Sequence, residues 1–138
     1  MKWLYRHLHK KEKGFTLVEL MVVIIILAVL TGIAIPSYLA LRNRARIQAT
    51  RSEMQNIGTA IAIYEADRGV FPATTWAALV TALEGDDVSG TGPYMANVPS
   101  EDAWDAAYTY VLATGSYTLT STGADPDIVL VDGVFTTE

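Results

Sequence analysis

The chain has 138 residues, enough for one small domain with an appendage. It contains no cysteine, which excludes disulfides and thiolate chemistry, and both of its histidines lie in the first nine residues. Residues 1–14 carry five basic residues against one acidic residue, whereas residues 15–138 carry five arginines against fourteen acidic residues. The acidic body argues against general nucleic-acid binding, and without its first residues the chain has no histidine for Ser-His, Cys-His or His-zinc sites.

A basic leader stands directly before a long apolar segment. Residues 1–14 have a net charge of +4, and positive residues before a membrane span tend to stay on the cytoplasmic side. The segment from Phe15 to Ile35 is interrupted only by two threonines, one glutamate and one glycine. As a helix it measures roughly 30 Å, and Val22–Leu30 is apolar on every face, so we expect it to enter a membrane rather than a small core.

The position of a cleavage site separates this leader from a secretory signal peptide. A signal peptide is cut after its apolar core, at small residues. Here the suitable position lies before the core, between Gly14 and Phe15. Such a cut removes the leader, leaves Phe15 with a free α-ammonium group, and keeps the apolar helix as a membrane anchor, a packing surface, or both in turn.

The helix is predicted to continue beyond Pro36. Pro36 lacks the N–H that bonds to the carbonyl of Gly32, so we expect a kink or a locally weak helix there. From Ser37 to about Asp67, however, apolar residues recur at helical spacing, and the whole helix then has about 53 residues and a length of ~80 Å. The apolar stripe consists of Leu39, Ile47, Met54, Ile57, Ile61 and Tyr64.

Residues 70–138 must cover one side of that helix. A threonine at position 74 or 75 can cap a short helix that ends near Leu83, and a loop rich in glycine and proline follows. Three short antiparallel strands are expected at Tyr108–Leu112, Tyr117–Thr120 and Ile128–Val131. The sequence therefore predicts an α+β fold in which the long helix is packed by a short helix and a small antiparallel sheet. The predicted divisions are a leader at 1–14, a membrane-spanning half-helix at 15–41 and a globular head at 42–138.

Glu19 is the only charged residue in the apolar segment, four residues after Phe15. An ionisable group inside a membrane span is costly and indicates a functional site. A carboxylate and an ammonium group that are buried together offset much of each other's desolvation cost. We expect Glu19 to pair with a Phe15 ammonium group, within one chain or between two chains; the alternative is that Glu19 reaches the lipid headgroups.

A group of four arginines follows the apolar segment and has more than one interpretation. The arginines that follow the apolar segment can bind lipid phosphate, acidic residues of a neighbouring chain, or only water. Their position opposes the positive-inside preference, but the charge of the leader should dominate. The four arginines are Arg42, Arg44, Arg46 and Arg51.

Several acidic residues lie among the C-terminal turns, close to Ser121. Hard oxygen ligands that lie close together can hold Ca²⁺, although the spacing here does not match an EF-hand loop, and capping of Asx turns is the alternative. These residues are Asp125, Asp127 and Asp132.

A second carboxylate cluster precedes the first predicted strand. Paired carboxylates can perform acid–base chemistry, but nothing in the sequence suggests a pocket or a nucleophile beside them, so no enzyme activity is expected. The cluster consists of Glu101, Asp102 and Asp105.

The run from Gly14 to Glu19, Gly-Phe-Thr-Leu-Val-Glu, resembles the prepilin peptidase recognition motif, and with the long helix behind it the chain resembles the type IV pilin superfamily. The resemblance implies that the cut falls after Gly14 and that Phe15 becomes the N-methylated first residue. Glu19 is then the fifth-position glutamate, and Pro36 matches the proline where the helix can locally melt in the filament.

Three C-terminal segments resemble the major pseudopilins of type II secretion systems. Tyr64–Pro72 resembles their helix exit, and Ser121–Asp125 is similar to their Ser-x-Gly-Ala-Asp loop. Asp102–Tyr108 looks like a degenerate form of their Asp-Pro-Trp-Gly-x-Pro-Tyr segment, with other residues in place of Pro, Gly and Pro. In that family the loop binds calcium, which implies Ca²⁺ held first by Asp125, then by Asp127 and Ser121, and last by Asp132. The loop after Asp125 is short and lacks the family's glycine-rich insert.

The resemblance implies a structural subunit without catalysis. It would sit in the inner membrane with its N-terminus cytoplasmic and its head periplasmic, be cut by prepilin peptidase, and exchange lipid for copies of itself. The homopolymer would form a pseudopilus, with an inner-membrane assembly platform and minor pseudopilins as partners, and would drive protein export across the outer membrane. The alternatives are a type IV pilin whose surface filaments serve adhesion, motility or DNA uptake, and a membrane-tethered binding protein that never polymerises.

Overall fold

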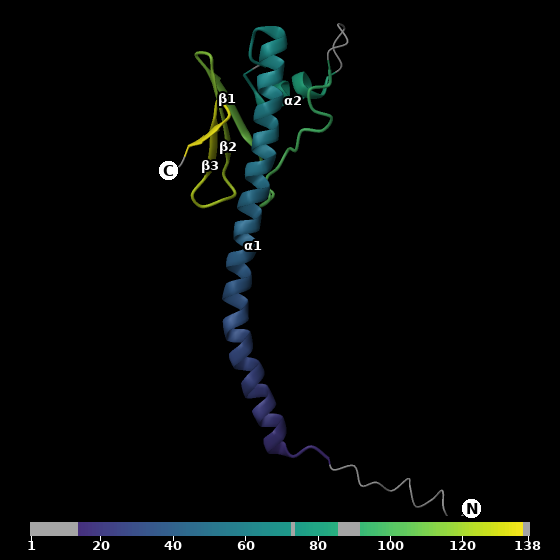
Figure 1. Ribbon diagram of the computed structural model, residues 1–138, viewed down its shortest axis with the longest axis vertical. Coiled ribbons are helices and arrows are strands. Elements are labelled where there is room, and N and C mark those ends of the chain that lie inside the picture. The colour runs from purple at the N-terminus through teal and green to yellow at the C-terminus, as the bar shows by residue number, and fades with distance from the viewer. Residues whose placement is uncertain (1–13, 73, 86–91, 137–138) are drawn as a thin grey trace, which may run out of the picture. The chain divides into compact units, whose positions relative to one another are not determined.

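The computed structural model describes residues 14–72, 74–85 and 92–136, so the predicted leader, apart from Gly14, lies outside the described residues. The elements follow in the order α1 (Leu17–Arg68), α2 (Trp76–Glu84), β1 (Thr109–Ala113), β2 (Ser116–Ser121), β3 (Ile128–Val131) and β4 (Val134–Thr136) (Figure 1). The strands form one antiparallel sheet in the order β1-β2-β3-β4. The α+β prediction is therefore confirmed.

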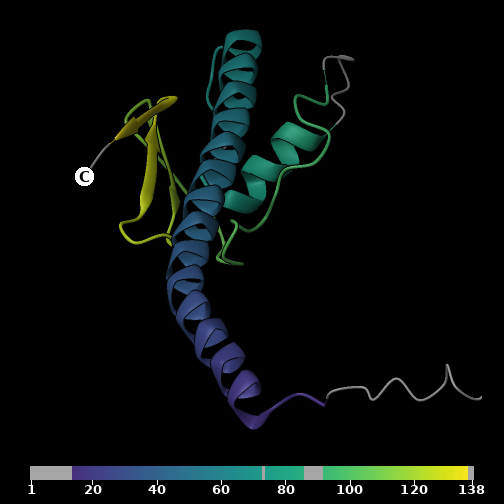
Figure 2. The same ribbon diagram turned by 60° about the horizontal axis from the view of Figure 1, so that its bottom comes forward.

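The chain divides into two compact units, Met1–Ala40 and Leu41–Glu138, and α1 contributes to both. It runs as one helix of 52 residues with Pro36 inside it, within two residues of the predicted span at either end. Within the second unit the sheet and α2 lie on different sides of α1 (Figures 1 and 2). We call this second unit the head.

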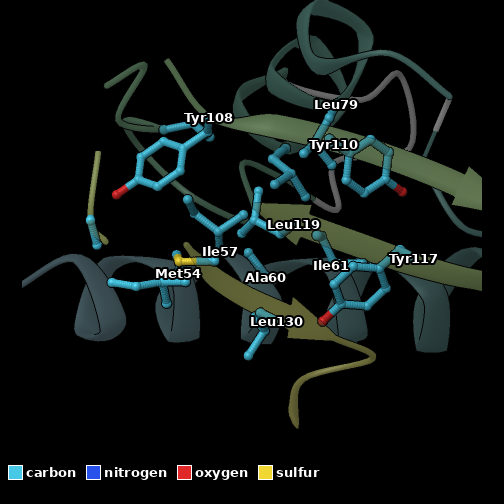
Figure 3. Close-up of a cluster of buried hydrophobic side chains, with 14 residues drawn as sticks. Met54, Ile57, Ala60, Ile61, Leu79, Tyr108, Tyr110, Tyr117, Leu119 and Leu130 are labelled. Atoms are coloured by element: carbon cyan, nitrogen blue, oxygen red, sulfur yellow. The ribbon is translucent and has the colours of Figure 1, made fainter. Parts of the chain in front are cut away.

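One apolar core holds the head together. Its side chains come from α1, from α2 and from the inward faces of β1, β2 and β3 (Figure 3). The residues of α1 in it are Met54, Ile57, Ala60 and Ile61. Steps of three and four residues place them on one face of α1, as the apolar stripe predicts. Leu39 was wrongly included in that stripe: it is 53% exposed and belongs to the first unit.

Alternation along the strands supplies the other wall of the core. Burial in β2 and β3 alternates residue by residue, and the register places the inward residues Tyr110, Leu119 and Leu130 side by side on three neighbouring strands. Side chains that are paired across strands in this way are the main source of stability in a sheet.

Two tight turns join the hairpins, and one of them reveals a strand that the sequence analysis missed. Thr114-Gly115 and Asp132-Gly133 both have positive φ at both positions, which suits the right-handed twist of two-residue hairpins. The Asp-Gly pair is a strong hairpin signal, although the sequence analysis treats Asp132 only as a candidate metal ligand. β4 follows it, so the sheet has four strands among the described residues instead of three.

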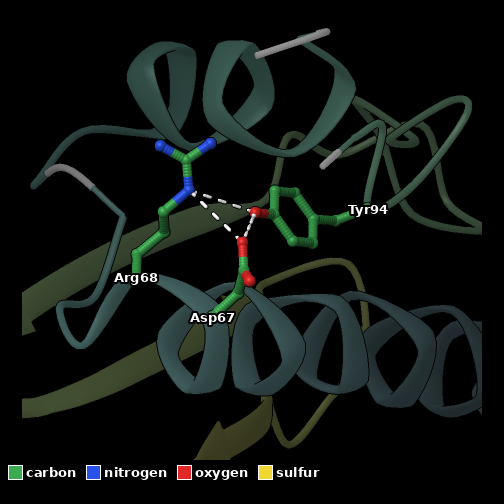
Figure 4. A network of polar contacts seen from close by, with 3 residues as sticks. All are labelled: Asp67, Arg68 and Tyr94. Atoms are coloured by element: carbon green, nitrogen blue, oxygen red, sulfur yellow. Dashed lines mark hydrogen bonds and ion pairs between the residues drawn. The ribbon is translucent and has the colours of Figure 1, made fainter. Parts of the chain in front are cut away.

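The C-terminal end of α1 is tied to the segment after α2. The hydroxyl of Tyr94 donates a hydrogen bond to Asp67 Oδ2 at 2.6 Å, and Arg68 Nε donates to the Tyr94 hydroxyl at 3.1 Å (Figure 4). Thr75 caps α2 as expected, accepting a bond from the backbone N–H of Ala78 at 3.4 Å. These contacts fix where the chain turns back along the helix.

Candidate functional site

The first half of α1 is a continuous apolar surface. From Leu17 to Leu41 its large apolar side chains are about half exposed or more, and within the described chain an 18-residue window with mean hydropathy 2.9 has none of its residues buried. Leaving one such side chain in water instead of burying it costs about 2 kcal/mol. By length and composition this helix can cross a membrane, and its surface is suited to lipid or to other helices.

Glu19 and Thr16 form a capping box at the start of α1. Glu19 Oε2 accepts hydrogen bonds from the backbone N–H of Thr16 at 2.9 Å and from its hydroxyl at 3.0 Å, while the backbone N–H of Glu19 donates to that hydroxyl at 3.2 Å. This arrangement satisfies N–H groups that a helix start leaves without partners. Glu19 thus has a local role that the sequence analysis did not include, although the pattern Thr-x-x-Glu signals it.

The proposed cleavage position is accessible. Gly14 and Phe15 are both exposed and precede the first residue of α1. A β-carbon placed on Gly14 would meet no atom within 4 Å, so packing does not require glycine at this position. A requirement for glycine there would come from a processing enzyme.

Pro36 lies within α1 and leaves the carbonyl of Gly32 without its usual N–H donor. Two nearby hydroxyls bond back to the helix: Thr31 Oγ1 to the carbonyl of Leu27 at 2.7 Å, and Ser37 Oγ to the carbonyl of Ile33 at 3.1 Å. Hydroxyls that bond back in this way are associated with helix bending. The segment therefore combines several features that weaken a helix locally.

The main polar site of the head joins Asp102 and Ser121, which the sequence analysis places in two separate candidate sites. Asp102 is 5% exposed, and each of its two oxygens accepts two hydrogen bonds. Oδ1 accepts from the backbone N–H groups of Trp104 at 2.8 Å and Ala106 at 3.0 Å. Oδ2 accepts from the hydroxyl of Ser121 at 2.5 Å and from the backbone N–H of Gly123 at 3.1 Å. We call these five residues the Asp102 clamp.

The clamp joins the segment before β1 to the loop between β2 and β3. A β-carbon on Gly123 would lie 2.6 Å from Asp102 Oδ2 and 2.7 Å from the β-carbon of Trp104, so this close approach requires glycine. Our cluster of Glu101, Asp102 and Asp105 is thereby divided, since Asp102 is buried while the other two are exposed. The spacing of Asp102 to the N–H groups two and four residues later is the one local signal of the clamp.

Electrostatics agree with an ionised Asp102. Burial opposes ionisation of this carboxyl, but the hydrogen bonds from Ser121, Trp104, Ala106 and Gly123 outweigh it and hold the pKa of Asp102 below its ordinary value. Elsewhere in the core, burial raises the pKa of Tyr110 to about 12. The clamp is thus a buried carboxylate that accepts four hydrogen bonds, three from backbone N–H groups and one from a hydroxyl.

The arginines divide into two pairs. The guanidinium carbon of Arg46 lies 6.0 Å from the centre of the Trp104 ring, and that of Arg51 lies 5.5 Å from the centre of the Phe135 ring. Both distances are within the range of cation–π contacts. Arg42 and Arg44 are exposed, and within the described part of the chain no contact is found for either.

Comparison with known proteins identifies the family. The family described as type II secretion system (T2SS), protein G, matches residues 37–128, and the prokaryotic N-terminal methylation motif matches residues 9–35. The chain belongs to the type II secretion system protein G family. It is a pseudopilin of type II secretion, as the resemblance predicted.

Curated relatives agree over most of their length. The chain is 30% identical over 134 residues to the type II secretion system core protein G of Escherichia coli K12, covering 90% of each chain. It is 28% identical over 123 residues to that of Pseudomonas aeruginosa, covering 84% of this chain and 86% of that protein. It is also 37% identical over 75 residues, about half of each chain, to the fimbrial protein EcpC of Eikenella corrodens. No solved structure matches the chain significantly.

The residues that the resemblance implied as calcium ligands do not converge in this pseudopilin. Ser121 lies at the end of β2, and its hydroxyl donates to Asp102. Asp132 lies beyond the opposite end of β3 from Asp127, where its oxygens accept bonds from the N–H of Tyr117 and the hydroxyl of Ser116. Among the residues that the structure describes, no three acidic or histidine side chains are grouped to hold a metal ion. Calcium binding therefore stays a prediction that rests on Asp125 and Asp127, without a complete set of side-chain ligands.

Proposed function

We propose that this pseudopilin is stored in the inner membrane by the first half of α1 and is then assembled, by exchange of lipid for copies of α1, into a pseudopilus that drives protein export. Prepilin peptidase cuts after Gly14, and Phe15 becomes the methylated N-terminus. The leader stays cytoplasmic and the head periplasmic. An inner-membrane assembly platform and minor pseudopilins are the partners of assembly, and the chain performs no catalysis.

One observation carries this proposal. The apolar half of α1 has no buried residue in the described chain, yet it is continuous with the half of α1 whose side chains are buried in the head. A surface that must be covered on all sides suits lipid before assembly and identical helices afterwards. Contacts between different patches of identical chains give open helical assemblies, as a filament subunit requires.

Glu19 gives the assembly its register in this proposal. In the filament its carboxylate neutralises the Phe15 ammonium group of a neighbouring copy. Breaking a buried ion pair by removing one partner costs about 3–5 kcal/mol, because the other charge is left without compensation. The competing explanation is that Glu19 acts only through its capping box with Thr16.

Three variants distinguish these roles in cells that carry the complete secretion machinery. Glu19→Gln keeps an N3 residue that suits a capping box but removes the charge; Glu19→Ala removes both; Thr16→Ala weakens the cap and keeps the charge. We expect both Glu19 variants to lower the yield of sedimented filaments at least about tenfold, and Thr16→Ala to assemble like wild type. Insertion and cleavage should be unchanged in all three. Normal filaments from Glu19→Gln would reject the pairing role.

The likeness to the fimbrial protein EcpC favours one second candidate, a subunit of surface filaments. Long filaments on the cell surface at native expression, together with normal export in a deletion strain, would favour it. Material that stays monomeric after crosslinking near Glu19 would instead favour a tethered protein that never polymerises.

A further inference from the structure

Four arginines begin the head, directly after the apolar half of α1. Arg42 follows Leu41, which ends the exposed apolar run, and the other three are Arg44, Arg46 and Arg51. We call these four residues the arginine collar. In a helix that crosses a membrane, residues at such a position leave the hydrocarbon and enter the headgroup layer.

The chain offers the outer part of the collar no acidic partner close in sequence. Residues 20–52 contain no aspartate or glutamate, whereas residues 53–138 contain thirteen acidic residues and one arginine. Arg42 and Arg44 are exposed and form no ion pair among the residues that the structure describes. Neither has a carboxylate within one helical turn, so a counter-charge for them has to come from outside this stretch of α1.

The collar is distributed around the helix. At about 100° per residue, Arg42 and Arg44 lie about 160° apart, on opposite sides of α1. Arg46 lies about 40° from Arg42, and Arg51 lies about 20° from Arg44, so each side carries two guanidinium groups. One docked protein reaches one side of a helix, whereas a layer of headgroups surrounds it and supplies phosphate to both sides.

The rise of α1 agrees with this position if α1 is stored across a membrane, as in the proposed function on which this inference rests. From Glu19 to Arg42 the helix rises ~35 Å. The hydrocarbon core is about 30 Å thick, and a bilayer with its headgroups measures about 40–45 Å. With Glu19 at one boundary of the hydrocarbon, Arg42 and Arg44 reach the opposite headgroup layer. Helix side chains lean towards the N-terminal end, which brings both guanidinium groups back towards the phosphates.

Trp104 supports the same surface. Its ring is partly exposed and lies 6.0 Å from the guanidinium carbon of Arg46. The segment that carries it is fixed to α1, because the N–H of Ala103 donates to the hydroxyl of Thr50 at 3.3 Å. Tryptophan is enriched at membrane–water interfaces, where one part of the ring is in apolar and another in wet surroundings. Cations and an interfacial type of ring therefore occur together beside the collar.

We propose that the arginine collar binds the phosphates of anionic lipids while the subunit is stored in the membrane, with Arg42 and Arg44 as the main contacts. A guanidinium group donates two parallel hydrogen bonds to one phosphate. Each basic residue near an anionic surface adds about a fivefold preference for it. The phosphate of a zwitterionic lipid already has an ammonium group beside it, so an anionic lipid is the better partner. The contact fixes the depth of the stored subunit, and assembly has to release it.

Lipid retention tests the contact. The chain is purified from membranes of cells that carry prepilin peptidase, so that the basic leader adds no lipid contacts, and is placed in nanodiscs with equal amounts of phosphatidylglycerol and phosphatidylcholine. Native mass spectrometry counts the lipids that stay bound on release. We expect the ratio of bound phosphatidylglycerol to phosphatidylcholine to fall about fivefold in Arg42→Gln and about 25-fold in Arg42→Gln/Arg44→Gln. The double lysine variant keeps the charge and should keep most of the preference.

An asparagine pair provides the matched control. Asn56→Asp/Asn97→Asp lowers the net charge by as much as the double glutamine variant does, at exposed positions that follow the collar. It should keep the wild-type lipid ratio. An unchanged ratio in the double glutamine variant would overturn the proposal, and so would an equal loss in the asparagine control, because net charge alone would then explain the preference.

Filament yield separates lipid from a neighbouring subunit as the partner. The double glutamine variant should insert and assemble like wild type, because the filament has exchanged lipid for other helices. Loss of its filaments together with an unchanged lipid ratio would mean that the arginines bind acidic residues of another subunit, and would overturn the proposal. An inserted wild-type chain without a preference for phosphatidylglycerol would reject the lipid contact alone. A wild-type chain that carbonate washes from the membrane would reject membrane storage, and with it the proposed function.

Discussion

At the scale of single residues, Asp102 is the one charged side chain that is buried among the described residues. A buried carboxylate is costly unless donors surround it, and here four hydrogen bonds do so. They tie the segment before β1 to the loop between β2 and β3, and the same segment is also bonded to α1 through the N–H of Ala103 and the hydroxyl of Thr50. The clamp thus gives the head a link between its loops without a disulfide.

The clamp predicts that the head is sensitive to acid. The pKa of Asp102 in the folded head lies below its unfolded value of about 3.9. Ionisation of Asp102 therefore stabilises the fold fully above the unfolded pKa, and this contribution is lost as pH falls from there through the lower pKa of the folded state. Asp102→Asn should lower the free energy of unfolding by about 1–3 kcal/mol at pH 7, because donors are left without acceptors. It should also flatten the loss of melting temperature between about pH 5 and pH 2.

Thermal melts followed by tryptophan fluorescence measure both effects. Ser121→Ala is the matched control: it keeps the charge and three of the bonds, and should cost about 1 kcal/mol. An Asp102→Asn head that is as stable as wild type at neutral pH would contradict this account of the clamp.

At the scale of elements, the β3–β4 hairpin explains Asp132 without a metal. Its carboxylate accepts bonds from the N–H of Tyr117 at 2.9 Å and from the hydroxyl of Ser116 at 2.8 Å, and its φ of 48° suits the turn. Aspartate and asparagine adopt such backbone angles more readily than other side chains. Asp132 therefore links the turn between β3 and β4 to the start of β2.

The corresponding prediction uses two substitutions of Asp132. Asp132→Ala removes both bonds and the preference for positive φ, and should lower the free energy of unfolding by about 1–2 kcal/mol. Asp132→Asn keeps the preference and one acceptor, and should cost less than half of that. Urea unfolding with and without Ca²⁺ measures both; an effect that occurs only when Ca²⁺ is present would identify Asp132 as a ligand instead.

At the scale of the whole molecule, the two halves of α1 serve different environments. Every residue of the apolar core lies at or after Met54, whereas the apolar side chains from Leu17 to Leu41 are exposed. The core of the head therefore needs only the second half of α1, which leaves the first half available for the exchange of lipid for other helices that we propose.

Truncation tests this division. A fragment of residues 41–138 keeps every core residue and should be soluble, with a melting temperature within a few degrees of the full chain in detergent. A fragment that begins at residue 62 loses all the buried residues of α1 and should show no cooperative transition. Aggregation of the longer fragment, or a large drop in its melting temperature, would show that the apolar half stabilises the head.

By itself, the sequence determined what depends on neighbouring residues. The apolar run, the helical period through Pro36, the threonine cap at position 74 or 75 and the short runs that become β1, β2 and β3 are local patterns, and each predicted an element close to its observed bounds. The same locality made Gly14 and Glu19 recognisable. Even β4, which the sequence analysis does not predict, follows a local Asp-Gly hairpin signal.

Only the tertiary structure decided which distant residues meet. Ser121 and Asp102 are 19 residues apart, and the contact of Arg51 with the Phe135 ring joins residues more than eighty positions apart. No period or spacing along the chain encodes such contacts, because they arise when a sheet packs on a helix and places its loops. That packing made Asp102 the structural carboxylate of the head, whereas the separation of Asp132 from Asp125 follows from β3 itself.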